Sequence, residues 1–112
     1  MKNMTIEEIM KDSRENDNYF FAERTMRVWE TKVMDEAEEN MFITRDKVGE
    51  LPDGSSKYNY YLRVYNPEQH RVWTVLIRDT LEEVKNEKAD ILAGNSPYCE
   101  KVEDFKKRGK LE

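Results

Sequence analysis

The sequence predicts an α+β domain on the basis of three local patterns. Apolar residues recur at helical spacing near both ends of the chain, alternate at strand spacing in its middle, and are separated by turn-forming residues. We expect two short N-terminal helices, an antiparallel meander of three or four strands, and a C-terminal helix packed on one face of the sheet. One domain should cover residues 1–95, followed by a flexible tail over residues 96–112.

The first helix is predicted from a capping box. Thr5 and Glu8 stand at the spacing that lets a hydroxyl and a carboxylate satisfy the first free amides of a helix. Apolar residues then follow on one helical face: Ile6, Ile9 and Met10. A second short helix is expected around residues 22–30. There, four residues share one helical stripe: Phe21, Thr25, Val28 and Trp29.

Two strand candidates lie between the second helix and the middle of the chain. The β-branched residues Thr31 and Val33 predict a short strand, and the segment MFITR at 41–45 predicts a longer one. The acidic run DEAEEN at 35–40 is interpreted as a solvated loop, with imitation of a phosphate run as the less favoured alternative. A further loop is expected over residues 48–56, where Pro-Asp-Gly supplies turn chemistry.

The clearest strand signal is YNYYLRVYNPEQHRVWTVLI, residues 58–77. Pro67, at the second position of the turn NPEQ, predicts a type I turn that closes a hairpin and brings Leu62 opposite Trp73. Alternation then points one nearly unbroken apolar set toward the core: Tyr58, Tyr60, Leu62, Val64, Trp73, Val75 and Ile77. The other side of the hairpin is expected to point outward.

A third helix is predicted after the hairpin. Thr80 and Glu83 form a second capping box, and Gly94 stands where a helix commonly ends in a left-handed residue. Between them, one face is apolar except for a lysine: Leu81, Val84, Lys88, Ile91 and Leu92. After this helix only Val102 and Phe105 could anchor the chain, so the tail is expected to be flexible or at best a short docked helix.

Composition restricts the classes of function. The net charge of −5 disfavours nonspecific binding to phosphate backbones, and no apolar run approaches the ~20 residues of a membrane span. A single cysteine is typical of a reducing compartment, so we expect a cytoplasmic protein with no membrane contact. One histidine and one cysteine, far apart, match no metal or triad spacing, and no glycine-rich phosphate loop occurs. We therefore predict no catalytic residue, cofactor or metal site.

The outward side of the hairpin is the candidate partner-binding face. Four aromatic or cationic residues should cluster there: Tyr61, Arg63, Tyr65 and His70. Such residues can contact another protein or stack the bases of RNA or single-stranded DNA. They can also simply stabilise a solvated sheet, or lie beneath a second layer of structure.

Three segments resemble a family of short, uncharacterised proteins that recur in bacteriophages and other mobile elements. YFFAERTMRVWETKV is similar to the FF…TMRFF segment of that family, FITRD at 42–46 to its FVTSE-like strand, and YYLRV at 60–64 to its YTVR-like strand. The chain departs from the pattern at Val28, Trp29 and Arg45. The resemblance covers roughly residues 4–93 and implies a small α+β domain of phage or mobile-element origin, without known catalytic residues.

The sequence therefore favours a non-enzymatic module that contacts another protein. The alternative is an RNA or single-stranded DNA binder that uses Tyr61, Arg63, Tyr65 and His70. The identity of the partner and the oligomeric state are left open.

Overall fold

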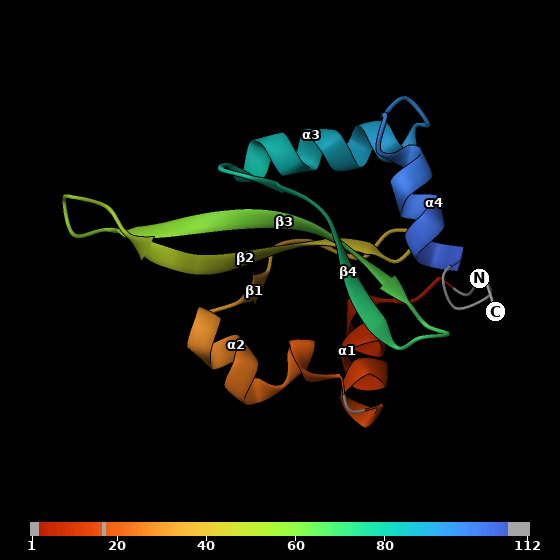
Figure 1. The fold of residues 1–112 in the computed structure, drawn as a ribbon, viewed down its shortest axis with the longest axis horizontal. Helices are drawn as coiled ribbons and strands as arrows, with labels where there is room; N and C mark the ends of the chain where they lie inside the picture. Colours follow the sequence, from red (N-terminus) through yellow and green to blue (C-terminus); the bar gives the residue numbers. More distant parts are fainter. Residues whose placement is uncertain (1–2, 17, 108–112) are drawn as a thin grey trace.

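The computed structural model describes residues 3–16 and 18–107. It forms one four-stranded antiparallel sheet in the order β1-β2-β3-β4, with α1 and α2 on one side and α3 and α4 on the other (Figure 1). The elements along the chain are α1 (Ile6–Glu15), η1 (Tyr19–Phe21), α2 (Glu23–Trp29), β1 (Lys32–Val33), β2 (Met41–Glu50), β3 (Ser56–Asn66), β4 (Arg71–Arg78), α3 (Leu81–Leu92) and α4 (Cys99–Lys107). The α+β class and the meander are confirmed.

The sheet carries a hydrophobic core on each face. The larger core lies under α3 and α4: Met41, Ile43, Leu62, Val64, Val75, Leu76, Val84, Ile91, Val102 and Phe105. The smaller core lies under α1 and η1: Ile6, Ile9, Phe21, Phe42 and Tyr65. Successive strand residues point to opposite faces, so Phe42 and Ile43 serve different cores. The expectation of cover on one face is therefore incomplete, because the N-terminal helices cover the other.

The helix ends follow local chemistry. The Thr5 hydroxyl accepts a hydrogen bond from the Glu8 amide at 3.2 Å, and the Glu8 carboxylate accepts one from the Thr5 amide at 3.0 Å. The Thr80 hydroxyl also accepts from the Glu83 amide, at 3.2 Å, but the Glu83 carboxylate accepts from that hydroxyl and not from the Thr80 amide, so the second capping box is half formed. Gly94 follows the end of α3 with φ of 79°. Both predicted capping positions are therefore confirmed.

The second predicted helix is confirmed as α2, which lies within the expected residues 22–30, but its predicted stripe is not. The 3₁₀ turn η1 and the helix α2 are separate elements, which breaks the predicted helical stripe. Phe21 is fully buried, whereas Val28 is 68% exposed and Trp29 is 50% exposed. The expected common face of these residues is wrong for the two residues at the end of α2.

The hairpin of β3 and β4 has a different register from the predicted one. Val64 lies opposite Trp73, and a bulge after Leu62 brings that residue opposite Leu76. The loop is longer because the Asn66 side chain accepts hydrogen bonds from two loop amides and His70 closes the loop with φ of 54°. A shift by two residues keeps each side chain on its predicted face. Beyond the bulge, however, Leu76 joins the core and Ile77 is exposed.

Residues 99–107 adopt the docked helix that was the less favoured expectation for the tail, and they are not flexible chain. They form α4, which packs on the sheet with Val102 and Phe105 buried. The Phe105 ring stacks on Trp73 with centroids 4.9 Å apart, and the Asn66 side chain donates to the Phe105 carbonyl at 2.9 Å. The domain therefore reaches at least Lys107, and residues 108–112 of the predicted tail lie outside the described residues.

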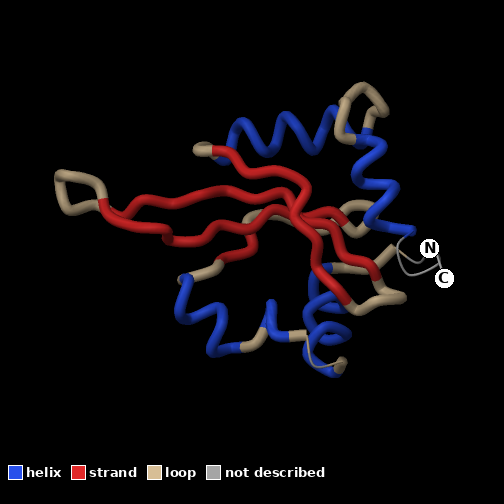
Figure 2. The backbone as a smooth tube through the Cα atoms, viewed as in Figure 1, coloured by secondary structure: helices blue, strands red, loops and turns tan. Residues whose placement is uncertain are grey.

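The hairpin of β2 and β3 projects beyond the rest of the sheet, as the tube in Figure 2 shows. β1 pairs with β2 only at Thr44 and Arg45, and β4 pairs with β3 only as far out as Tyr60. Residues 46–59 therefore form a two-stranded ribbon with a short tip, where a longer loop was expected. We refer to residues 46–59 as the ribbon.

Candidate functional site

The predicted partner-binding face is largely covered. Arg63 is 8% exposed and Tyr65 is 0% exposed, while Tyr61 and His70 are half-buried. Arg63 contacts Phe20 of η1 and the Tyr61 ring, and Tyr65 and His70 both contact Asp12 of α1. The four residues therefore lie on the side of the sheet that α1 and η1 cover. The expectation of an outward face is therefore wrong for Arg63 and Tyr65, because a second layer of structure packs over them.

Arg63 connects that second layer to the sheet. Its guanidinium lies 4.1 Å from the Tyr61 ring centroid and 4.8 Å from the Phe20 ring centroid. It also donates to the hydroxyls of Thr44 and Thr74 and forms an ion pair with Asp46 at 3.6 Å. Burial lowers the pKa of Arg63, and the charge of Asp46 opposes that shift. These contacts engage the guanidinium group on several sides, so Arg63 stabilises the packing of η1 on the sheet.

Tyr65 and His70 meet at one carboxylate of α1. The Tyr65 hydroxyl donates to Asp12 Oδ2, and His70 Nδ1 lies 2.8 Å from the same oxygen. Burial, with the hydrogen bond to Asp12, raises the pKa of Tyr65 well above its usual value. Asn18 donates to the His70 carbonyl at 2.6 Å, which holds the loop of the β3–β4 hairpin against the N-terminal segment.

This arrangement limits what the four predicted residues can do. Stacking of nucleic-acid bases needs open aromatic faces, and the Tyr65 ring is enclosed while Arg63 covers the Tyr61 ring. The cluster therefore joins α1 and η1 to the sheet. A binding role for Tyr61 and His70, which retain some exposure, stays a prediction.

The lysine on the apolar face of α3 has a structural partner. Lys88 is buried, and its ammonium lies 2.6 Å from Asp35 and 3.3 Å from Glu38. It also donates to the Glu36 carbonyl at 3.0 Å. The acidic run at 35–40 is therefore not only a solvated loop. Its contacts with Lys88 connect α3 to the segment between β1 and β2. The signal in the sequence was a lysine on an otherwise apolar helical stripe, but the sequence did not show which carboxylates it meets.

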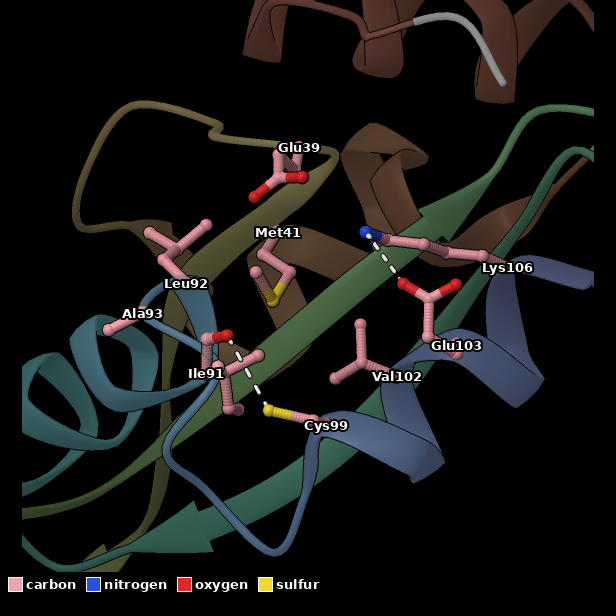
Figure 3. Close-up of a pocket in the computed structure, with 10 residues that line it drawn as sticks. Glu39, Met41, Ile91, Leu92, Ala93, Cys99, Val102, Glu103 and Lys106 are labelled. Atoms are coloured by element: carbon pink, nitrogen blue, oxygen red, sulfur yellow. Dashed lines mark hydrogen bonds and ion pairs between the residues drawn. The ribbon is translucent and has the colours of Figure 1, made fainter.

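A pocket of about 300 Å³ lies where α3 and α4 meet the start of β2 (Figure 3). Cys99 points toward it and donates to the Ile91 carbonyl at 3.6 Å, and Glu103 pairs with Lys106 at 3.9 Å. Within residues 3–16 and 18–107, no group of three or more metal-ligating side chains occurs. The pocket offers apolar walls and an internal ion pair, and the predicted lack of catalytic, cofactor and metal sites stays a prediction.

The ribbon carries exposed apolar side chains. Val48, at the bulge of β2, is 41% exposed, and Leu51, just after the end of β2, is 44% exposed. Arg45 lies over the Tyr58 ring, 4.1 Å from its centroid. A groove of about 340 Å³ runs along the outer side of β3, lined by Leu51, Ser56, Lys57, Tyr58, Tyr60 and Asp79. The sequence placed Tyr58 and Tyr60 in the core, and Tyr60 does pack against the larger core. The groove was missed because it depends on where β4 stops pairing with β3.

Comparison with known proteins identifies a family. A family of unknown function, DUF7447, matches residues 5–89. The chain belongs to this family. The match runs from the N-cap of α1 into α3 and includes the whole sheet and the ribbon. No curated protein and no solved structure matches the chain. Membership of an uncharacterised family is thus confirmed, and the phage or mobile-element origin stays a prediction.

The described helices show no sign of a membrane span. None in residues 3–16 and 18–107 has both the length and the apolar character needed to cross a bilayer. The cytoplasmic location and the lack of membrane contact stay predictions.

Proposed function

We propose that this chain is a non-enzymatic protein-binding module whose contact surface is the ribbon. One observation carries the proposal: the ribbon extends past both flanking strands and presents Val48 and Leu51 to solvent. A two-stranded hairpin without further strands or a covering helix is only marginally stable in water, so a partner that covers the ribbon would stabilise it.

Burying the exposed apolar side chains of the ribbon would contribute to the free energy of binding a partner. Fully burying a Val or Leu side chain contributes about 1.5–3 kcal/mol relative to leaving it exposed. Because Val48 is 41% and Leu51 is 44% exposed, covering what remains would contribute about 1–3 kcal/mol for the two together, before the cost of ordering is subtracted. The half-buried Tyr58 and Tyr60 add aromatic surface of the kind enriched at binding hot spots.

Protein is the favoured class of partner. The net charge of −5 disfavours a phosphate backbone, and Arg63 and Tyr65 of the nucleic-acid hypothesis are buried. If the chain has the phage or mobile-element origin that its resemblance implies, a protein of the host cell is the first class of partner to test.

Affinity capture from a lysate of the source cells tests the proposal. The bait proteins are the unaltered chain, a Val48→Ser/Leu51→Ser double variant, and Val28→Ser as a control at a more exposed apolar site on α2. We expect a protein that is retained by the unaltered chain and by the control and lost with the double variant. Retention of the same proteins by all three baits would contradict the proposal.

A further inference from the structure

Most of the outer backbone of the sheet is protected from added strands. Two carbonyl groups of β4 already accept hydrogen bonds from side chains, so they are not free to pair with an added strand. Lys101 donates to the Val75 carbonyl at 2.7 Å, and Arg78 donates to the Ile77 carbonyl at 2.8 Å. On the opposite side, β1 is only two residues long. Short edge strands and lysine side chains on an edge are common protections against unwanted pairing.

The outer edge of β2 beyond β1 is protected in another way. Its register shifts between Lys47 and Gly49, and such a bulge twists an edge away from a potential partner. Thr31 donates to Asp46 at 2.6 Å, and Glu30 forms an ion pair with Lys47 at 3.5 Å. The end of α2 is therefore fastened alongside this edge.

One stretch of edge is left open except for the side chain of Lys57. β4 ends its pairing with β3 at Tyr60. Among residues 3–16 and 18–107, the four residues Ser56–Asn59 of β3 therefore have β2 on one side and no strand on the other. Four residues of strand span about 13 Å, enough for a short added strand. This stretch borders the groove of about 340 Å³, whose walls include Leu51, Tyr58 and Tyr60.

The charges beside this edge indicate what an added strand should carry. Lys57 lines the groove, and Arg45 lies over the Tyr58 ring. Among the described residues, neither cation has a carboxylate within ion-pair distance, and Arg45 Nε has no hydrogen-bond partner. Asp79 also lines the groove, so a run of several acidic residues would be repelled there.

We propose that an extended segment of another protein adds as a strand to Ser56–Asn59, with apolar side chains in the groove and one acidic side chain beside Lys57. This inference rests on the proposed function and names its partner chemistry. Backbone hydrogen bonds to the open edge would supply affinity, and the contacts of alternate side chains would supply specificity.

A displayed library of random linear peptides, selected on the full chain, tests the inference. We expect the selected peptides to alternate apolar residues with a single Asp or Glu. The same selection on Lys57→Glu should instead enrich Lys or Arg, whereas Lys85→Glu, an exposed control on α3, should leave the preference for acidic residues unchanged. A selected peptide should bind Lys57→Glu about tenfold more weakly than the unaltered chain.

Hydrogen exchange with that peptide locates the contact. Amides within Ser56–Asn59 should become protected, since an added strand accepts hydrogen bonds from this edge. No enrichment over an uncoated surface, selection insensitive to Lys57→Glu, or protection elsewhere would each overturn the inference. If capture still depends on Val48 and Leu51, the ribbon binds protein through these side chains and only the added strand is refuted.

Discussion

Replacing Arg63 tests whether the face of the sheet that carries it is covered by α1 and η1 or open to solvent, because the two cases predict different losses in the free energy of unfolding. In Arg63→Met, the long apolar side chain keeps much of the packing but removes the charge between Thr44, Thr74 and Asp46. Removing one partner of a buried ion pair costs about 3–5 kcal/mol, because the other charge stays buried without compensation. Asp46 keeps its hydrogen bond from Thr31, so we expect the lower end, about 3 kcal/mol.

Chemical denaturation followed by circular dichroism measures this change in the free energy of unfolding. The matched control is Arg24→Met, an exposed arginine of α2, which should change stability by less than about 0.5 kcal/mol. A destabilisation of Arg63→Met that is as small as the control would refute the reasoning. It would mean that the guanidinium is solvated and that the face beneath η1 is open.

Two further substitutions test the contacts that join helices to the sheet. Tyr65→Phe removes the hydroxyl that donates to Asp12 and should cost about 1.5 kcal/mol in denaturation. Because the folded protein raises the pKa of Tyr65, this stabilising contribution is present below about pH 10 and is lost as the pH rises above it. A stability difference that persists above pH 10 would be inconsistent with that pKa. Asn66→Ala should cost about 2 kcal/mol and speed amide exchange in α4, since the Phe105 carbonyl and two loop amides lose a partner; unchanged exchange in α4 would show that Asn66 does not hold it.

Local signals in the sequence were sufficient for the helix ends and the strand faces. The capping pairs that begin at Thr5 and Thr80 act within one turn, so no tertiary information is needed to find them. Alternation in the β3–β4 hairpin likewise assigned Val64 and Trp73 to one face. Their pairing was missed because the length of the loop depends on the Asn66 side chain and on a left-handed residue at His70.

Local sequence patterns could not show that α1 and η1 pack over the predicted partner-binding face. The apolar stripe of α1 shows that Ile6 and Ile9 are buried, but not which face of the sheet buries them. The docking of α4 depends on a ring stack with Trp73 and a hydrogen bond from Asn66, both distant in the sequence. The ribbon was missed for a related reason, because its exposure follows from where β1 and β4 stop.

Site-specific photocrosslinking in the source cells tests the central claim most directly, namely that the ribbon contacts a protein. A photoreactive amino acid is placed at Leu51 in one protein and at Val28, an exposed site on α2, in another. The proposed function predicts a discrete crosslinked protein from position 51 and none from position 28. Equal crosslinking from both positions, or crosslinks from position 28 alone, would contradict it.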